Sequence, residues 1–505
     1  MAESIGLTIG NPKFWDARDL RAEVDRIFDI CHSCRLCFKF CGTFPAIFAG
    51  IDRRTEQNRS AYLRAHPEVV EAANRKRAAA AAAGPVARDA HLETAEGFGD
   101  ELPELNAHAR ELTDAEVDHA VDLCFQCKLC YPNCPYTPPH DWALDFPRLL
   151  LRWKAQRVRR KGVPLKTRLI RNATLIGTIG SRAAGLNNWA MRLRPNRIAM
   201  EKTVGIHRDK LMPTFHAETF PTWLRRRGPA KVEAPQALKD GITEPTPLRV
   251  ALFSTCLVDF HAPGTGRAAV QVLEHLGVEV VRPPEQVCCG MPFLDGGDVE
   301  ACAVKARKNV AVLHDWVARG YRVVIPSPSC SLVVREEYPQ LVDDPAARAV
   351  AAASHDLMEY VYRIAREGRL KRDFRRRLGT VKYHVPCHLR VQNVGIRALD
   401  VLKVISDEVE AVHECSGHDG TWSMQKEHFA ESLHWGRKAF DGMRATLGDG
   451  CSGACSDCGL AALHLKQGAG VDAVHPIVAL AWAYGFDVGD AAKLLVEKRP
   501  SSSAS

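Results

Sequence analysis

Two groups of four cysteines give this sequence its clearest chemical signal. In each group three cysteines are separated by two residues, and a fourth follows after three more. The groups are Cys31, Cys34, Cys37 and Cys41, then Cys124, Cys127, Cys130 and Cys134. At this spacing three thiolates wrap three corners of one [4Fe–4S] cubane, and the fourth ligates the other cluster. We therefore expect cluster one on Cys31, Cys34, Cys37 and Cys134, and cluster two on Cys124, Cys127, Cys130 and Cys41.

Structural zinc is the main alternative, because Cys-x2-Cys pairs also bind zinc. A zinc site needs four tetrahedral ligands and gains nothing from a doubled three-plus-one layout. Cys134 is followed by Pro135, as in ferredoxin-type motifs. Cys41 is followed by Gly42 instead, which alters the local turn but removes no ligand. The spacing thus favours iron–sulfur clusters in both groups.

Eight further cysteines form two similar groups in the second half of the chain, and short apolar runs typical of buried strands precede most of them. These runs are 249–253, 278–281, 322–325, 381–385 and 409–412, with helical patterns at 264–276, 298–318, 396–406 and 426–446. The cysteines are Cys256, Cys288, Cys289 and Cys330, then Cys387, Cys415, Cys455 and Cys458. The repeated order indicates a duplicated strand–cysteine–helix module. The carboxyl ends of strands are where α/β folds build their sites.

Helical patterns surround the first two cysteine groups. Leu20, Val24, Ile27 and Phe28 share one face before the first group, and Thr113 with Glu116 forms a capping box before the second. Pro147 suits the start of a further helix whose basic side chains spread away from its apolar face. Residues 42–112, with the alanine run 78–83, are expected to be an insertion that is partly helical, and 213–247 a proline-rich linker.

The length of 505 residues is too great for one ordinary core. We expect an α+β protein: an all-α ferredoxin-like N-terminal domain with two [4Fe–4S] clusters, followed by a duplicated α/β cysteine-rich domain. The expected boundaries are 1–145 for the helical cluster domain, 146–247 for a basic helical region and linker, 248–378 and 379–490 for the two copies, and 491–505 for a disordered tail.

The second half resembles a known family of iron–sulfur oxidoreductases. Cys288-Cys289-Gly290 and Cys415-Ser416-Gly417 look like the signatures of two CCG domains. Two such domains behind two ferredoxin-type motifs resemble the iron–sulfur and catalytic subunits of heterodisulfide reductases and, more closely, the C subunit of anaerobic glycerol-3-phosphate dehydrogenases. Further segments shared in style are 335–339, 386–393 and 415–421.

The resemblance implies five cysteines in each full CCG domain, and this chain has four. Ser327 stands in the fifth place in copy one, and Ser416 in copy two. Four thiolates can still hold a [2Fe–2S] or [4Fe–4S] cluster, or they can act as redox-active thiols, and the residues leave both open. A serine does not replace a soft thiolate on equal terms, which counts against disulfide reduction of the family's kind.

The expected function is electron transfer within an oxidoreductase. The resemblance implies a flavoprotein dehydrogenase or another redox protein as partner, and quinone or another terminal acceptor. The alternative is a heterodisulfide- or persulfide-type reductase that acts on a sulfur substrate through the CCG domains. Gly264-Thr265-Gly266 lacks the third glycine of a dinucleotide fingerprint, so no flavin or NAD site is expected. No catalytic residue is assigned.

The positive charge is concentrated in one block. From Arg148 to Arg227 there are 20 Lys and Arg against 3 Asp and Glu, whereas the whole chain carries a net charge of +8. The block suits an acidic partner or an anionic membrane surface; no nucleic-acid motif accompanies it, so nucleic acid is not expected. The N-terminus does not have the pattern of a signal peptide, so we expect a cytoplasmic protein that can lie on the inner face of the cell membrane.

Four other residues have ordinary interpretations. Cys302 lies in a helical pattern and suits a small core residue, and Cys451 suits a free thiol. His388 and His418 flank motif cysteines and are expected to be hydrogen-bonded polar neighbours rather than ligands.

Overall fold

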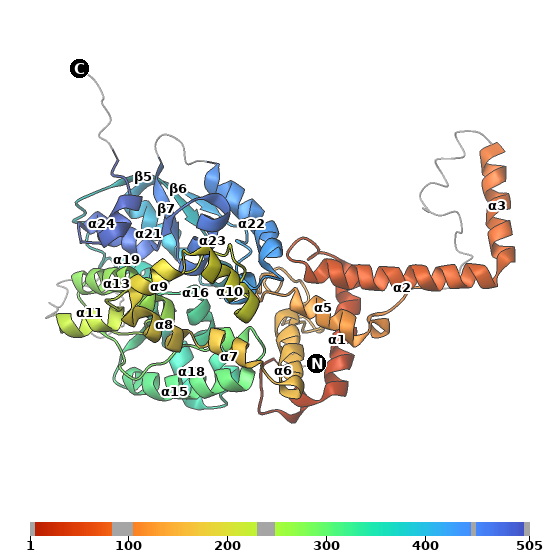
Figure 1. Ribbon diagram of the computed structural model, residues 1–505, viewed down its shortest axis with the longest axis horizontal. Helices are drawn as coiled ribbons and strands as arrows, with labels where there is room; N and C mark the ends of the chain where they lie inside the picture. Colours follow the sequence, from red (N-terminus) through yellow and green to blue (C-terminus); the bar gives the residue numbers. More distant parts are fainter. Residues whose placement is uncertain (1–5, 83–104, 230–247, 446–450, 499–505) are drawn as a thin grey trace, which may run out of the picture. The chain divides into compact units, whose positions relative to one another are not determined.

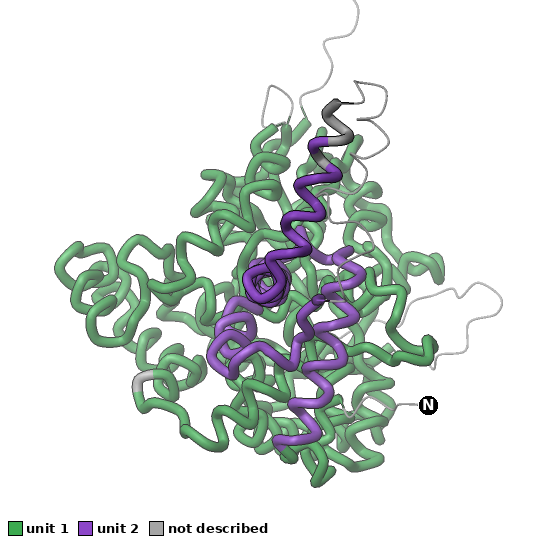
Figure 2. Tube along the Cα trace, turned by 90° about the vertical axis from the view of Figure 1, so that its right-hand side faces the viewer, with its two compact units in different colours: residues 1–16, 125–505 green, residues 17–124 purple. Residues whose placement is uncertain are grey.

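The computed structural model describes residues 6–82, 105–229, 248–445 and 451–498. The chain forms two compact units, and each is described by itself (Figure 2). The smaller unit is Ala17–Cys124, and the larger combines Met1–Asp16 with Phe125–Ser505. Within the described ranges, no helix is both long and apolar enough to cross a lipid bilayer. The domain boundaries expected above remain predictions.

The smaller unit is helical, with α1 (Ala17–Cys34), α2 (Thr43–Ala65), α3 (Pro67–Ala82) and α5 (Asp114–Asp122). Leu20, Val24, Ile27 and Phe28 of α1 are buried, as their spacing predicted. The capping box between Thr113 and Glu116 is also present. The sequence predicted that residues 42–112 are an insertion. The start of this segment instead belongs to the core of the unit, because the first turns of α2 bury Phe44, Phe48 and Ile51. Residues 83–104 lie outside the described part of the chain.

Two four-stranded parallel sheets form the centre of the larger unit (Figure 1). The first has the order β2-β1-β3-β4, from β1 (Leu248–Leu252), β2 (Val278–Val281), β3 (Arg322–Ile325) and β4 (Ser354–Asp356). The second has the order β6-β5-β7-β8, from β5 (Leu378–His384), β6 (Ser406–Val412), β7 (Cys451–Ser456) and β8 (Ala473–Val474). The matching order and parallel pairing make the two halves structural copies. Parallel sheets are typically covered on both faces.

One apolar core runs through both copies. It includes Val250 and Leu273 of the first copy and Val381, Leu402 and Leu480 of the second. Most of its helical residues come from α13 (Pro263–His275), α19 (Leu357–Arg366), α21 (Arg397–Ile405) and α24 (Pro476–Tyr484). Shared burial of this kind fixes the two copies against each other, so side chains between them have a defined position.

Shorter helices complete the two copies. In the first they are α12 (Cys256–Phe260), α14 (Met291–Leu294), α15 (Val299–Ala318), α16 (Pro328–Leu332), α17 (Tyr338–Leu341) and α18 (Pro345–Ala352). In the second they are α20 (Cys387–Val391), α22 (Phe429–Arg444) and α23 (Gly459–Ala469). Helices α12 and α20 begin at Cys256 and Cys387, directly after the first strand of each copy.

The basic block forms α6 (Phe146–Lys161), α7 (Leu165–Arg171), α8 (Ala173–Arg182), α9 (Ala184–Ala190), α10 (Arg194–Val204) and α11 (Phe220–Arg227). Helix α6 differs from its sequence interpretation, because two of its basic residues, Arg152 and Lys154, are buried. Arg152 donates a hydrogen bond of 2.9 Å to the carbonyl oxygen of Phe14, and Lys154 donates one of 3.4 Å to that of Asp295. Backbone carbonyl oxygens thus accept hydrogen bonds from these two buried cationic groups.

Helix α11 lies within the segment expected to be a linker. Phe220 at its start is fully buried and packs against Gly266 of α13. The region 213–247 is therefore structured at least as far as this helix, because a large aromatic side chain anchors it in the first copy. Residues 230–247 lie outside the described part of the chain.

Candidate functional site

The first ferredoxin-type group lies in the smaller unit. Cys31 and Cys34 occupy the last turn of α1, Cys37 lies in the following turn, and Cys41 is buried just before α2. Burial and the nearby Cys124 thiolate raise the pKa of Cys41 to about 12. The structure therefore brings Cys41 close to Cys124, the first cysteine of the second group, with which its spacing predicted a shared cluster.

The two ferredoxin-type motifs share an unusual backbone feature. Arg35, directly after Cys34, has φ of 52°, and Lys128, directly after Cys127, has φ of 58°. Both residues are in the left-handed region at equivalent places in the Cys-x2-Cys-x2-Cys pattern. Non-glycine residues rarely adopt this conformation and do so mostly at functional sites. The chain thus reverses sharply after the second cysteine of each motif.

In the first copy, the cysteines gather at the carboxyl ends of β1, β2 and β3. Cys256 opens α12, Cys288 and Cys289 follow β2, and Cys330 lies in α16 after β3. The sulfur atoms of Cys289 and Cys330 are 3.2 Å apart, and the thiols of Cys256 and Cys288 interact directly. The four residues that the sequence singled out therefore meet at one place.

In the second copy, three of the four predicted cysteines gather in the same way. Cys387 opens α20 and interacts with Cys415, which follows β6. Cys458 caps α23, where its sulfur accepts a hydrogen bond of 3.4 Å from the backbone N–H of Ala461. Cys455 lies elsewhere, because its side chain is fully buried in the apolar core.

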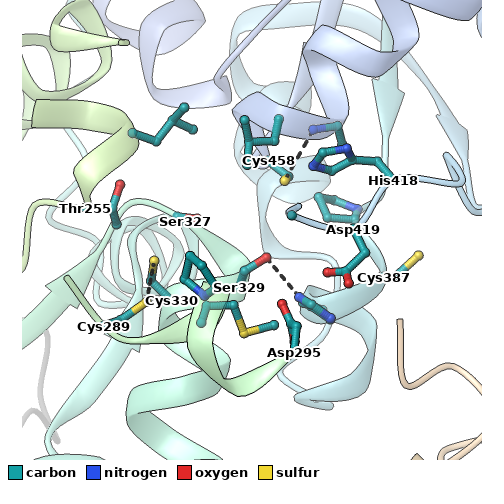
Figure 3. Close-up of a pocket in the computed structure, with 18 of the residues that line it drawn as sticks. Thr255, Cys289, Asp295, Ser327, Ser329, Cys330, Cys387, His418, Asp419 and Cys458 are labelled. Atoms are coloured by element: carbon teal, nitrogen blue, oxygen red, sulfur yellow. Dashed lines mark hydrogen bonds between the residues drawn. The ribbon is translucent and has the colours of Figure 1, made fainter. Parts of the chain in front are cut away.

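A cavity of about 110 Å³ separates the cysteines of the two copies (Figure 3). Thiols from both copies line it, together with Cys127 of the second ferredoxin-type motif: Cys127, Cys256, Cys288, Cys289, Cys330, Cys387 and Cys458. Ser327 and Ser416, which stand in the places of the missing fifth cysteines, line the same cavity. The two halves of the duplication therefore face each other across one site.

One thiol in each copy is set apart as the easiest to ionise. Hydrogen bonds from the Cys256 and Cys289 thiols and from the backbone N–H of Gly290 hold the pKa of Cys288 well below its usual range. In the second copy, Cys127, Cys387 and the N–H of Gly417 do the same for Cys415. The first cysteine of each CCG signature is thus favoured as the thiolate, the form that binds metal.

The donors present suit iron–sulfur clusters, because soft thiolates are the ligands of such clusters. Among the described residues, no group of three or more His, Cys, Asp or Glu side chains is arranged to hold a single metal ion. All 18 cysteines are free thiols. The fit to a cluster therefore rests on the number and type of the thiolates that converge on the cavity.

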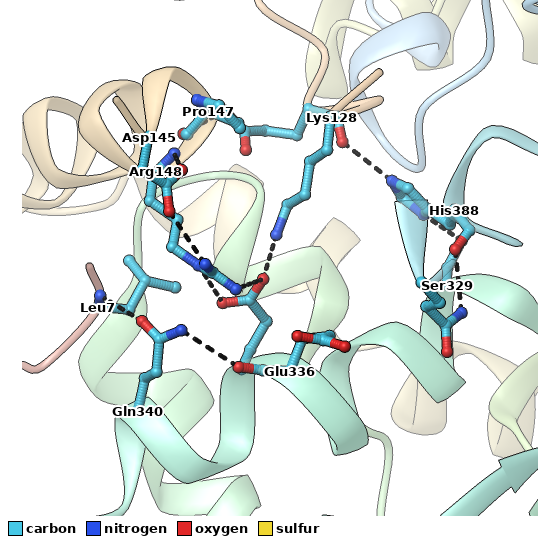
Figure 4. Close-up of polar contacts among 12 residues, drawn as sticks. Leu7, Lys128, Asp145, Pro147, Arg148, Ser329, Glu336, Gln340 and His388 are labelled. Atoms are coloured by element: carbon cyan, nitrogen blue, oxygen red, sulfur yellow. Dashed lines mark hydrogen bonds and ion pairs between the residues drawn. The ribbon is translucent and has the colours of Figure 1, made fainter. Parts of the chain in front are cut away.

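Buried polar contacts fix the second ferredoxin-type motif to the first copy (Figure 4). Lys128 and Arg148 both bind Glu337, with 3.2 Å between Arg148 Nε and Glu337 Oε2. Burial alone would raise the pKa of Glu337, but the two cations outweigh it and lower this pKa to about 2. The carboxylate is therefore ionised in a site with no solvent exposure.

The ring of His388 fixes the same motif to the second copy. Its Nδ1 lies 2.9 Å from Ser329 Oγ, and its Nε2 lies 2.9 Å from the carbonyl oxygen of Gln126. Burial lowers the pKa of His388 to about 4, so the ring is neutral at pH 7. His418 is hydrogen-bonded through Nδ1 to Ser423 Oγ at 2.9 Å. Both histidines have the polar contacts expected from the sequence.

A second, more open cavity of about 530 Å³ reaches Cys256 and Cys288 from the side of α8 and α11. Arg182, Arg225 and Arg282 line it. Arg282 is fixed by hydrogen bonds to Ser254 Oγ at 2.6 Å and Asp259 Oδ2 at 2.9 Å. Two cavities therefore reach the cysteines of the first copy.

Four charged residues of this region were not recognised from the sequence: Lys128, Asp295, Glu337 and Asp419. Lys128 and Glu337 are 209 positions apart, so no local pattern links them. The only signal was indirect, because Glu337 lies in the segment 335–339 and Asp419 in the segment 415–421 that were noted for their resemblance.

Comparisons with known proteins agree with this arrangement. Residues 250–335 and 381–462 match the family described as a cysteine-rich domain (CCG). Residues 90–160 match the citrate utilization protein B Fer4-like domain.

Several curated proteins are similar in sequence. The chain is 26% identical over 325 residues to the C subunit of anaerobic glycerol-3-phosphate dehydrogenase of Escherichia coli (strain K12), covering 63% of this chain and 77% of that protein. It is 34% identical over 196 residues to lactate utilization protein A of Bacillus pumilus, covering 37% of this chain and 79% of that protein. It is 32% identical over 222 residues to the protein of the same name from Bacillus cytotoxicus, covering 42% of this chain and 88% of that protein.

Proposed function

Since this chain belongs to the family of iron–sulfur oxidoreductase-type proteins with two cysteine-rich domains, we propose that it is the electron-transfer subunit of an oxidoreductase. It passes electrons between a dehydrogenase or reductase partner and quinone or another terminal acceptor. A dehydrogenase partner agrees with the name of one relative, which is a subunit of anaerobic glycerol-3-phosphate dehydrogenase. A flavoprotein is the partner that the resemblance favours, because the chain has no dinucleotide fingerprint of its own.

The direct interaction between Cys127 and Cys415 carries this proposal. Cys127 belongs to a ferredoxin-type motif, and Cys415 to the second CCG signature. Iron–sulfur clusters bound at such motifs supply one-electron transfer. Two cysteine groups that touch provide a short route between an electron entry point and the cavity where an acceptor would bind.

We propose the ligand sets that the spacing predicts. Two [4Fe–4S] clusters are held by Cys31, Cys34, Cys37 and Cys134, and by Cys124, Cys127, Cys130 and Cys41. The groups at Cys256, Cys288, Cys289 and Cys330, and at Cys387, Cys415, Cys455 and Cys458, are candidates for further clusters. The burial of Cys455 in the core weakens its place in the last set. Lys128, Glu337 and His388 hold the second motif against both copies.

The surface of α7, α8 and α9 supports a peripheral position on an anionic membrane. Seven large apolar side chains are exposed on these three helices: Leu165, Leu169, Leu175, Ile176, Ile179, Leu186 and Trp189. Arg168, Arg182 and Arg192 are close to them in the sequence. Helices that combine exposed bulky apolar residues with basic ones bind membrane interfaces. We call this region the α7–α9 surface.

The test of the electron-transfer role is a pair of matched substitutions. Anaerobically purified Cys127→Ser should lose the iron and the EPR signal of one cubane, while Cys451→Ser, which changes a half-buried thiol outside all the motifs, should keep both. After anaerobic reduction and removal of excess reductant, the wild-type protein and Cys451→Ser should pass electrons to a one-electron acceptor, and Cys127→Ser should not. Equal electron flow in both variants and the wild-type protein would show that the chain is not an electron carrier of this kind.

A sulfur-substrate reductase is the second candidate, and one observation favours it. Thiols of both copies converge on the same cavity, where a disulfide could meet redox centres from two sides. Ser327 and Ser416 are buried at the edge of that cavity and count against the five-cysteine cluster of the heterodisulfide reductases. Reduction of a small disulfide by the methyl viologen-reduced protein would decide between the two candidates.

A further inference from the structure

Two aspartates that belong to no cysteine motif meet in the cavity between the copies. Asp295 ends α14 in the first copy, and Asp419 follows the Cys415-Ser416-Gly417 signature in the second. Asp295 is 7% exposed and Asp419 is 6% exposed, and both line the cavity (Figure 3). Each copy therefore contributes one carboxyl group to a site whose other titratable side chains are thiols and histidines.

The two carboxyl groups interact directly. Their side chains are within hydrogen-bonding reach of each other. Neither oxygen of Asp295 has a hydrogen-bond donor among the described residues. Two ionised carboxylates can only accept hydrogen bonds and repel each other, whereas one shared proton turns one of them into a donor. The contact is therefore satisfied only when the pair holds a proton.

Burial and the neighbouring charges agree with a shared proton. Burial raises the pKa of both groups, and the charge of Asp295 raises that of Asp419 further. Three cations on other elements act in the opposite direction and lower the pKa of Asp295. They are Lys128 beside Cys127, Lys154 on α6 and Arg171 on α7. The histidines that line the cavity, His384, His388 and His418, all have lowered pKa values and are neutral at pH 7. The cations stabilise one negative charge on the pair but leave its proton in place.

We propose that Asp295 and Asp419 form one proton-sharing acid that protonates an acceptor bound in this cavity. The proposal rests on the electron-transfer function proposed above, because the electrons reach the acceptor through the cysteine-bound clusters. It also defines the class of acceptor: a compound that takes up two electrons and two protons, such as a quinone or a disulfide, rather than a one-electron acceptor.

The step balances in both cases. The partner protein supplies two electrons, one at a time. In a quinone each carbonyl oxygen gains a proton and becomes a hydroxyl, and in a disulfide the S–S bond breaks and each sulfur becomes a thiol. The first proton is the one that the aspartates share, and the second is transferred after solvent has reprotonated the pair. A carboxyl group in this role contributes about 10²- to 10⁴-fold to the rate.

The experiment compares Asp295→Asn and Asp419→Asn with Glu300→Gln, which changes an exposed carboxylate on α15. Each protein is reduced anaerobically and freed of excess reductant, and the acceptors are a ferricenium salt, a water-soluble quinone and a small disulfide. Both aspartate variants should reduce the quinone or the disulfide at least about 100-fold more slowly, and ferricenium within about twofold of the wild-type rate. The compound whose reduction slows in the aspartate variants, quinone or disulfide, identifies the class of the acceptor. Iron content and EPR signals should stay unchanged in all variants.

Infrared difference spectra give a readout that does not need turnover. A protonated carboxyl C=O band should be present at pH 7 in the wild-type protein and in Glu300→Gln, and should be lost or shifted in each aspartate variant. If a variant loses its iron, the wild-type pH profile remains decisive: the ratio of the proton-consuming rate to the ferricenium rate should fall as pH rises. A flat ratio would overturn the proposal.

The two proposals fail in different ways. A wild-type protein that passes no electrons to ferricenium contradicts the electron-transfer function. A wild-type protein that reduces all three acceptors, with unchanged quinone and disulfide rates in both aspartate variants, contradicts only the proton-sharing pair.

Discussion

The ammonium group of Lys128, between Cys127 and Cys130 of the second ferredoxin-type motif, donates a hydrogen bond to the fully buried carboxylate of Glu337. Arg148 shares the same carboxylate and also binds Asp145, at 2.9 Å from Oδ2. Glu337 thus anchors a cysteine loop and the start of α6 to the first copy. The position of Cys127 at the cavity depends on this contact as much as on the motif itself.

Loss of the Glu337 charge should destabilise the protein. In Glu337→Gln two buried or half-buried cations lose their partner, and breaking a buried pair in this way costs about 3 kcal/mol or more. Glu336→Gln is the matched control, because its side chain is exposed on the next position of the chain. Anaerobic denaturant unfolding at pH 7 measures the difference. A change below about 1 kcal/mol in Glu337→Gln would show that the pair is not structurally important.

Gly417 should not tolerate a side chain. Its φ is +70°, and a Cβ atom would lie 2.0 Å from the carbonyl oxygen of Ser432. Gly205 is the control, with φ of +80° and nothing within 4 Å of the same position. Gly205→Ala should cost about 1 kcal/mol from backbone strain alone, and Gly417→Ala clearly more. Gly417→Ala should also disturb Cys415, whose sulfur accepts the Gly417 N–H at 3.3 Å. Equal unfolding free energies would contradict this explanation.

Local patterns were enough to find most of the two sheets. The apolar runs predicted strands at 278–281 and 322–325, and β2 and β3 have these bounds. The duplication is also present as two sheets of matching order. Strand β7 was missed, because its sequence CSGACS contains no apolar run. The short strands β4 and β8 were also missed, because three and two residues carry too little periodicity to be recognised.

The contacts that shape the site depend on tertiary structure. Arg152 and Lys154 were expected away from the apolar face of their helix, but this part of α6 is buried and they bind carbonyl oxygens. The aspartates of the cavity come from different copies, at positions 295 and 419. Cys455 fits the motif spacing yet packs in the core. Only the packing of the copies against each other shows which of these residues share a site.

Lys210 should make the stability of the protein rise with pH. Its ammonium is buried beside Ser423 Oγ and His464 Nδ1, and burial lowers its pKa from 10.5 to about 7. Between these values the unfolded chain binds a proton that the folded chain does not, so the free energy of unfolding increases with pH. The slope is at most about 1.4 kcal/mol per pH unit. Unfolding measured from pH 7.5 to 9.5 should lose this contribution in Lys210→Met, and identical slopes in both proteins would contradict it.

The α7–α9 surface should bind anionic membranes. Vesicle flotation should recover the protein with vesicles that contain acidic lipids and not with neutral ones, because basic residues gain about 1 kcal/mol each near an anionic surface. Salt at about 0.5 M should release much of it, since the screening length is already about 10 Å at 0.1 M. The double variant Leu165→Ala/Trp189→Ala removes two side chains that are 73% and 57% exposed, and it should weaken binding. Val304→Ala, which removes a 62% exposed apolar side chain on α15, is the control and should not. Equal recovery with neutral and acidic vesicles, or equal binding by both variants, would assign these exposed apolar residues to a protein partner instead.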